Sequence, residues 1–227
     1  DEVYSGWFKT GPMFNFLRVK DLYPDILTTS KSLGGGKASI ACYISDKRTF
    51  KKAYGNLKDS IIHSTTYNGF GEETVTALES INISIEENYH QKAKKIQKKF
   101  EIKLLQLKND FPDLILDYSG SGALYGIFIN DETLNVVART MIKNLKIGIL
   151  NDNRFINKLI IGSIIEEMYS SENYLLFFGS NFKIPLILST PINIELEEVD
   201  LFFEALTRTL NKGLNKLFIK LLKKKFF

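Results

Sequence analysis

Residues 24–36 read Pro24-Asp25-Ile26-Leu27-Thr28-Thr29-Ser30-Lys31-Ser32-Leu33-Gly34-Gly35-Gly36. The first part, residues 24–29, is an apolar and β-branched run, which predicts a buried β-strand. The second part, residues 30–36, predicts a glycine-rich turn that begins with a lysine. Glycine has no Cβ, so three glycines in a row let the backbone pass close to a flat ring. The sequence therefore predicts that Lys31 lies at a strand end, beside a backbone that a planar group can approach.

The chemistry of Lys31 depends on its surroundings. A lysine amine is a poor nucleophile at its ordinary pKa of about 10.4. Desolvation at a strand end, or a nearby cation, lowers such a pKa and permits imine formation. The alternative is a solvated lysine in a flexible loop, and the adjoining strand and glycines favour the reactive site over it. A Walker-type phosphate loop at Gly34-Gly35-Gly36-Lys37 is excluded, because no glycine precedes it at the required spacing.

The composition is that of an ordinary globular protein. Of the 227 residues, 44% are hydrophobic and 25% are charged, which excludes a disordered chain. The apolar runs are too short to span a bilayer. The net charge of +4, with lysines concentrated in residues 92–108 and 212–225, does not indicate a dedicated nucleic-acid binder. The single cysteine, Cys42, excludes an internal disulfide and fits a reducing cytoplasm.

Strand and helix patterns alternate along the chain and predict an α/β organisation with a boundary near residues 86–95. The predicted strands are residues 24–29, 38–45, 114–118, 124–129, 159–164, 174–178 and 185–189, and residues 1–4 have the pattern of a strand end. The predicted helices are residues 70–87, 92–107, 131–145 and 194–217. We expect the basic and apolar tail, residues 214–227, to be a helix docked on its own domain, with a membrane-surface helix as the alternative.

Three more segments before residue 70 carry features that need an explanation. Asp1-Glu2-Val3 places a carboxylate that can hold a protonated ring nitrogen, or that serves only in a turn. His63-Ser64-Thr65-Thr66-Tyr67 leads into a predicted helix, where hydroxyls act as helix caps or as phosphate ligands. The loop Gly6-Trp7-Phe8-Lys9-Thr10-Gly11 has no purpose that its chemistry alone reveals.

Taken together, these motifs resemble those of the class III aminotransferases. That family carries Asp-Glu-Val, a Gly-x-x-Arg-Thr-Gly loop, Pro-Asp-Ile, Ser/Ala-Lys-x-x-Gly-Gly-Gly and His-x-Thr-Thr-aromatic, in this order. The sequence contains all of these motifs in the same order, with Lys9 in place of the arginine. The resemblance is specific over residues 1–90 and general in layout over residues 91–210.

The resemblance implies an α/β chain that is part of a pyridoxal-phosphate-dependent transferase of fold type I. Residues 1–90 would form the C-terminal part of the cofactor-binding large domain, with a mostly parallel sheet and helices. Residues 91–227 would form the small C-terminal α/β domain. The chain would then be the C-terminal half of a longer protein, and inactive without the half that supplies most of the phosphate-binding groups.

The resemblance also implies pyridoxal 5′-phosphate as the cofactor, without a metal. Lys31 would be the catalytic residue that forms the Schiff base. Asp1 would pair with the pyridine nitrogen, Val3 would pack on the ring, and Tyr4 would contact the phenolic oxygen where the family often has glutamine. Thr66 would reach the phosphate of the neighbouring subunit's cofactor, so the resemblance implies a homodimer.

The implied reaction moves an amino group from an amine or amino acid to a 2-oxo acid in the cytoplasm, without a nucleic-acid or membrane partner. Residues 185–192 contain no arginine, although many family members hold the substrate carboxylate with one there. That carboxylate therefore needs another partner, or the substrate lacks it. An aminomutase or decarboxylase of the same fold and a non-catalytic relic are the alternative functions.

Overall fold

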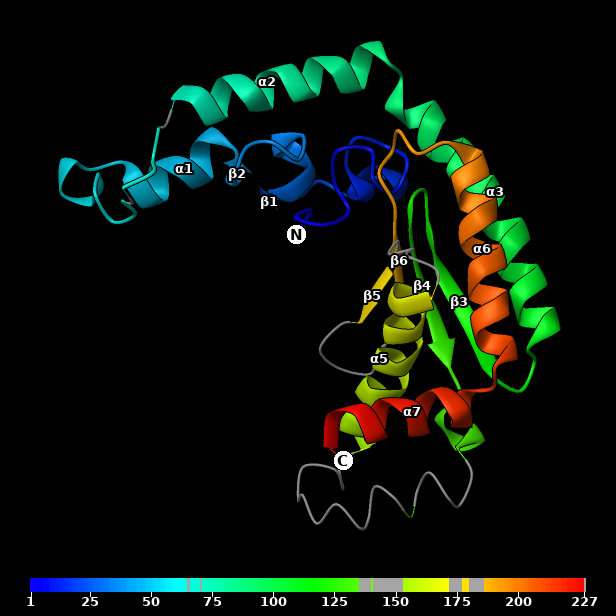
Figure 1. The fold of residues 1–227 in the computed structure, drawn as a ribbon. Helices are drawn as coiled ribbons and strands as arrows, with labels where there is room; N and C mark the ends of the chain where they lie inside the picture. The colour runs from blue at the N-terminus through cyan, green and yellow to red at the C-terminus, as the bar shows by residue number, and fades with distance from the viewer. Residues whose placement is uncertain are drawn as a thin grey trace. The chain divides into compact units, whose positions relative to one another are not determined.

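The computed structural model describes residues 1–64, 66–69, 71–134, 140, 153–171, 177–179 and 186–226. Two compact units make up the chain: unit 1, Asp1–Lys94, and unit 2, Lys95–Phe227 (Figure 1). Helix α3 begins in unit 1 and ends in unit 2. The assignment of these units to a large and a small domain stays a prediction.

Unit 1 contains a two-stranded antiparallel sheet, in which β1 (Ile26–Thr29) pairs with β2 (Cys42–Ser45). Burial alternates along β1, where Leu27 and Thr29 are buried and their neighbours are exposed. Short 3-10 helices are η1 (Asn15–Arg18), η2 (Lys31–Gly34) and η3 (Leu57–Asp59). The α-helices are α1 (Lys47–Tyr54), α2 (Gly71–Glu86) and the start of α3 (Tyr89–Asp110).

Unit 2 contains a four-stranded antiparallel sheet with the order β3-β4-β6-β5. Its strands are β3 (Ile115–Ser121), β4 (Leu124–Ile129), β5 (Phe177–Gly179) and β6 (Leu186–Ser189). Its other elements are η4 (Asp131–Thr133), α5 (Asn153–Ser171), α6 (Leu196–Asn211) and α7 (Leu214–Phe226).

An aromatic cluster joins the sheet of unit 2 to two of its helices. The buried ring of Phe100 on α3 meets Tyr125 on β4 edge-on, with 5.6 Å between ring centres. The same ring meets Phe203 on α6 at 6.0 Å. Large rings bury the most apolar surface per residue, and edge-to-face pairs add to that burial. The cluster therefore explains why α3 and α6 lie side by side against the sheet (Figure 1).

Several sequence predictions are confirmed. The chain is α/β, helices occur at residues 71–86 and 89–110, and strands occur at residues 115–121 and 124–129. The described strands pair only antiparallel. The mostly parallel sheet was expected of the complete large domain, of which residues 1–90 would form only a part. A parallel pair needs a crossover connection, usually a helix, whereas η2 is the helical element between β1 and β2. Of the predicted helix at residues 131–145, all but residues 131–134 and 140 lies outside the described part of the chain.

The predicted strand at residues 159–164 is wrong, because these residues lie within helix α5. A short apolar run does not distinguish a buried strand from a buried helix. Here Ile160, Ile161, Ile164 and Met168 are all buried, and their spacing places them on one face of α5.

The predicted single helix at residues 194–217 is also wrong, because α6 ends at Asn211 and α7 begins at Leu214. Gly213 between them has a φ of +88°, in the left-handed region that favours glycine. Helix α7 buries Leu217, Phe218 and Leu222 in the core of unit 2, as expected of a helix docked on its own domain. Across the described ranges, no helix has the length and apolar character needed to cross a membrane.

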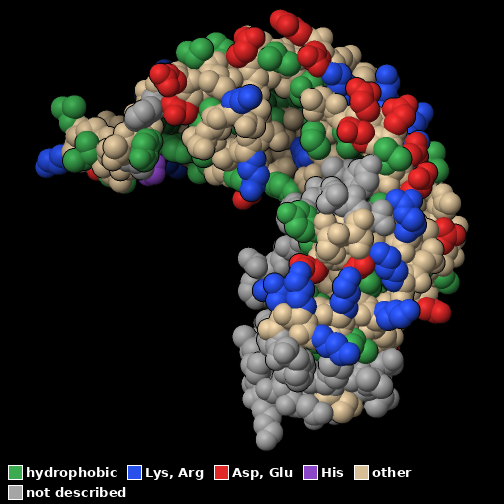
Figure 2. Space-filling model, in the orientation of Figure 1, with side chains coloured by type: hydrophobic (Ala, Val, Ile, Leu, Met, Phe, Trp, Pro, Cys, Tyr) green, Lys and Arg blue, Asp and Glu red, His purple; other side chains and the backbone are tan. Residues whose placement is uncertain are grey.

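A buried carboxylate fastens α7 to α5. Glu167 on α5 accepts hydrogen bonds from Lys220 Nζ at 2.7 Å, Lys212 Nζ at 3.0 Å and Ser171 Oγ at 2.8 Å. These contacts, chiefly the one from Lys220, lower the pKa of Glu167 to about 2 despite its burial. Lysine and arginine side chains gather on the face of unit 2 that Figure 2 shows. Lys220 of the basic tail and Lys212 just before it have a structural role in this unit.

We expect Glu167→Gln to lower the free energy of unfolding by about 2 kcal/mol at pH 7, since it removes the charge that two ammonium groups surround. The folded pKa lies below the ordinary value near 4.5. The stabilisation is therefore complete above about pH 5 and lost as the pH falls towards 2. Urea unfolding between pH 3 and 7 measures it. Glu166→Gln, which breaks a more exposed pair with Lys224, is the control and should cost less than about 0.5 kcal/mol.

Candidate functional site

Lys31 lies immediately beyond β1, after Ser30, and begins η2. Its φ is +49°, in the left-handed region that residues with a side chain rarely adopt. Its side chain is exposed, and its Nζ lies over the ring of Tyr4, 5.2 Å from the ring centre. An ammonium within about 6 Å of a ring face is attracted to it. The predicted glycine-rich turn with an accessible lysine is therefore present.

Glu2 holds the N-terminal segment against β1. Its backbone N donates to the carbonyl of Thr28 at 2.8 Å. Its buried carboxylate accepts from the backbone N of Phe16 at 2.8 Å and from the hydroxyl of Ser5. Residues 1–4 are a turn held by these bonds and not the predicted strand end. Glu2 was missing from the predicted site, and its position between Asp1 and Val3 in one motif was the only signal for it.

Asp1 and Val3 form a local turn of their own. The Asp1 carboxylate is exposed and accepts from the backbone N of Val3 at 2.8 Å, which is how aspartate commonly stabilises a turn. Tyr4 follows and contacts Lys31. Asp1, Val3 and Tyr4 thus lie in one short segment, and the ring of Tyr4 contacts the amine of Lys31.

Thr66 is exposed in a turn that precedes α2. Within the described residues, no hydrogen bond or ion pair connects it to Lys31. Thr65 of the same motif lies outside the described part of the chain. The predicted role of Thr66 at a neighbouring subunit stays a prediction.

The glycines after Lys31 serve two different purposes. Gly35 and Gly36 both have positive φ, +59° and +73°. A Cβ at Gly35 would lie 2.8 Å from Ser80 Oγ of α2, so this glycine lets η2 pack against the helix. A Cβ at Gly36 would meet no atom within 4 Å. The open surface at Gly36 is where a flat group has room to approach the backbone.

The loop Gly6–Gly11 has a structural purpose that its sequence did not reveal. Trp7 Nε1 donates to Thr29 Oγ1 at 2.7 Å, which ties the loop to the end of β1. Trp7 also packs edge-on against Phe14, with 5.0 Å between ring centres. Trp7 and Phe8 both have left-handed backbone, with φ of +54° and +65°. Backbone of this kind persists only where surrounding contacts hold it, and it concentrates at functional sites.

Lys9 of this loop is a buried amine, with 9% of its surface exposed. Burial removes water from the ammonium and lowers the pKa of Lys9 to about 8. The sequence singled out Lys9 only as a replacement for an arginine, and its burial is a result of tertiary packing.

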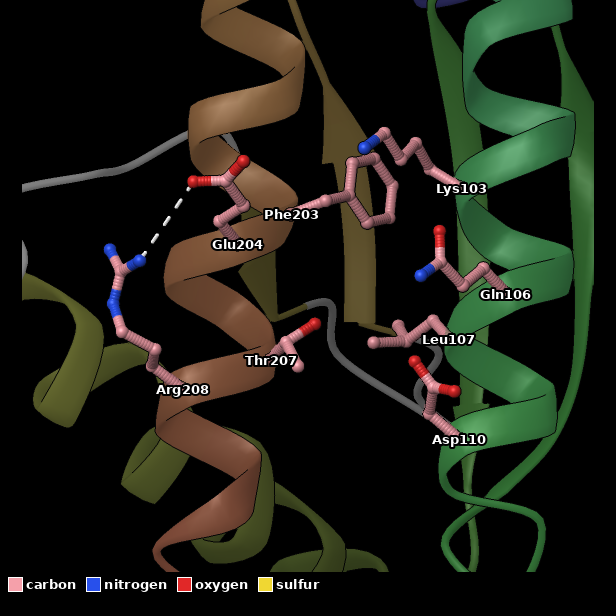
Figure 3. A pocket seen from close by; sticks show the side chains of 8 residues that line it. All are labelled: Lys103, Gln106, Leu107, Asp110, Phe203, Glu204, Thr207 and Arg208. Atoms are coloured by element: carbon pink, nitrogen blue, oxygen red, sulfur yellow. Dashed lines mark ion pairs between the residues drawn. The ribbon is translucent and has the colours of Figure 1, made fainter.

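Unit 2 contains a groove between α3 and α6 with a volume of about 280 Å³ (Figure 3). Its lining residues are Lys103, Gln106, Leu107, Asp110, Phe203, Glu204, Thr207 and Arg208. The charged groups are of both signs, with Glu204 and Arg208 4.0 Å apart, and the apolar members Leu107 and Phe203 are buried in the core. The groove contains none of the predicted site residues, so the candidate site is the Lys31 turn of unit 1.

The comparisons with known proteins concern the family and the fold of the chain. A family model for class III aminotransferases matches residues 1–162. An S-selective transaminase from Arthrobacter sp. is 21% identical, with a TM-score of 0.73, and the match covers 93% of this chain and 43% of that one. Plasmodium falciparum ornithine delta-aminotransferase is 20% identical, with a TM-score of 0.69, over 93% of this chain and 46% of that one. An omega-transferase from Vibrio fluvialis is 18% identical, with a TM-score of 0.67, over 97% and 46%.

The TM-scores show that the chain shares the fold of these proteins. It spans less than half the length of each of them.

We predict that the two glycines differ in their tolerance of a side chain. Gly36→Ala adds only left-handed strain, about 1 kcal/mol. Gly35→Ala adds the same strain and a clash with Ser80, so we expect a loss of about 2–3 kcal/mol. Denaturant unfolding followed by the fluorescence of the single tryptophan, Trp7, measures both. Equal losses would contradict the close packing of η2 on α2.

Lys9→Met should remove a pH dependence of stability, because it removes a buried amine that is costly to charge. The folded pKa of about 8 lies below the ordinary 10.5. The free energy of unfolding of the wild type should therefore rise as the pH increases from 8 to 10.5, and Lys9→Met should not show this rise. Unfolding at pH 7 and pH 10 tests this, with the exposed Lys37→Met as a control that keeps the rise. An equal pH dependence in Lys9→Met and the wild type would contradict it.

Proposed function

From the premise that the chain belongs to the class III aminotransferases, we propose that it carries the catalytic lysine of a pyridoxal-phosphate-dependent aminotransferase. The reaction moves an amino group from an amine or amino acid donor to a 2-oxo acid. The observation that carries the proposal is the Lys31 amine, exposed directly after β1 on a left-handed backbone and beside Tyr4. A lysine held in this way at a strand end has an amine that a carbonyl compound can reach.

The residues present fit pyridoxal phosphate. The backbone at Gly36 is open, the amine of Lys31 is exposed, and an exposed carboxylate stands at Asp1. When bound, the cofactor supplies an electron sink that stabilises negative charge on the substrate carbon that loses a proton. The protein's part is to hold the cofactor, to orient it and to move that proton.

Each predicted site residue has a role in this proposal. Lys31 attaches to the cofactor through its amine and then carries the proton to and from the substrate Cα. Asp1 would pair with the ring nitrogen, because a neighbouring carboxylate favours the protonated form of that nitrogen. Val3 packs on the ring and the Tyr4 hydroxyl contacts the phenolic oxygen. Thr66 contacts the phosphate of the neighbouring subunit's cofactor, which makes the active unit a homodimer.

We further propose that this chain is the C-terminal half of the complete enzyme and is inactive alone. The match with solved transaminases covers 43–46% of their length. In unit 1, Leu57, Ile61 and Tyr67 are 94%, 78% and 75% exposed. Exposed apolar surface of this extent indicates contact with further protein, and it supports the proposal that the remaining part of the enzyme packs on this unit.

An aminomutase or decarboxylase would use the same lysine and carboxylate. An aminotransferase requires a 2-oxo acid as amino acceptor in every turnover, whereas the other two do not. Omission of the acceptor from a steady-state assay therefore separates these functions: lost turnover supports the aminotransferase.

The attachment of the cofactor to Lys31 can be tested directly in the full-length polypeptide, that is, the complete enzyme of which this chain is proposed to be one half. With pyridoxal phosphate added, we expect an absorption band at about 410–430 nm. Borohydride should then fix the cofactor covalently on Lys31, as peptide mass spectrometry would show. Lys31→Ala should lose both the band and the labelled peptide. The control is Lys37→Ala, which removes an exposed lysine from the same turn and should keep both.

The absence of the band in the wild-type polypeptide would overturn the proposal and favour a non-catalytic relic. Label on another lysine in the wild type would overturn the assignment of Lys31.

A further inference from the structure

The amine of Lys31 has an aromatic neighbour, the ring of Tyr4. Its Nζ lies 5.2 Å from the centre of the Tyr4 ring. Over the described ranges, Lys31 makes no ion pair or hydrogen bond with a carboxylate. The ring face of Tyr4 is therefore the group that attracts the ammonium in the structure.

The Tyr4 ring and the Lys31 amine are each positioned by structure outside their own contact. Tyr4 belongs to the segment that Glu2 fastens, through its amide to Thr28 O at 2.8 Å and through its carboxylate to Phe16 N at 2.8 Å. Lys31 follows β1 with its φ of +49°. Thr28, which anchors the Tyr4 segment, and Lys31 lie at the same end of one strand, so the ring and the amine are held together by the framework.

We propose that Tyr4 is a positioning residue whose ring face holds the Lys31 ammonium in a resting place, which the amine must leave before it attacks a carbonyl carbon. The idea rests on the proposed function, because it concerns the same lysine. An attacking amine needs its lone pair, so the ammonium that the ring attracts is the unreactive form. The attraction at an exposed site corresponds to a slowing of about two- to fivefold.

This restraint depends on the ring of Tyr4. A glutamine side chain has no ring face and cannot hold an ammonium in this way. The same tyrosine can still present its hydroxyl to a bound cofactor. Tyr4 therefore restrains the free lysine through its ring and contacts the cofactor through its hydroxyl.

The rate of reductive methylation tests the proposal, with formaldehyde and cyanoborohydride as the probe and no pyridoxal phosphate present. In the full-length polypeptide at pH 7, peptide mass spectrometry measures the labelling of Lys31 relative to the exposed Lys37. Tyr4→Leu removes the ring and should label Lys31 about two- to fivefold faster. Tyr4→Phe keeps the ring face and should label Lys31 at the wild-type rate.

An unchanged rate in Tyr4→Leu would overturn the proposal, and so would an equal increase in both variants. If a variant fails to fold, NMR of the wild type alone still tests the proposal. Protons above an aromatic ring are shielded by its ring current, so the ε-methylene resonances of Lys31 should lie upfield of those of Lys37. Coincident resonances would overturn the proposal. Since neither assay contains the cofactor, failure here is distinct from failure of the borohydride test of Lys31.

Discussion

The candidate site depends on the attachment of the Glu2 segment to β1. One bond joins the Glu2 amide to Thr28 O, and the buried Glu2 carboxylate holds Phe16 N in addition. A buried carboxylate without partners would be costly, and these donors make its burial possible. Because Thr28 is close to the strand end from which Lys31 projects, this attachment also decides which side chain faces the lysine. Loss of it would separate Tyr4 from Lys31 without altering either residue.

The turn that carries Lys31 is restrained from two further sides. Trp7 donates to Thr29 Oγ1, and Gly35 lets η2 approach Ser80 on α2. Left-handed residues at Trp7, Phe8 and Lys31 lie on this framework, and such backbone costs free energy that only surrounding contacts can offset. Two further left-handed residues, Asp21 and Asn88, lie outside this framework, so such backbone is not confined to the turn of Lys31.

Unit 2 is stabilised in a different way. Its sheet and helices share one apolar core with Phe100 among the fully buried rings. Lys212, Lys220 and Lys224 pair with Glu167 and Glu166 of α5. These three lysines thus have a structural explanation within the unit. Neither the core nor these pairs involve the predicted site residues, so the chemistry proposed for the chain is confined to unit 1.

The sequence by itself was sufficient for the α/β class, for α2, α3, β3 and β4, and for the family resemblance, because local periodicity and ordered motifs do not depend on long-range contacts. It failed at α5, where a short apolar run fits a strand as well as a helix, and at Gly213, where one left-handed residue ends a helix whose apolar pattern continues. The motifs pointed to Asp1, Val3, Tyr4, Lys31 and Thr66 as site residues. Only the tertiary structure decided that Glu2 is buried, that Lys9 loses water, and that the Tyr4 ring meets the Lys31 amine. Contacts between residues far apart in the chain depend on how β1, the loops and α2 pack, and a linear pattern does not contain that information.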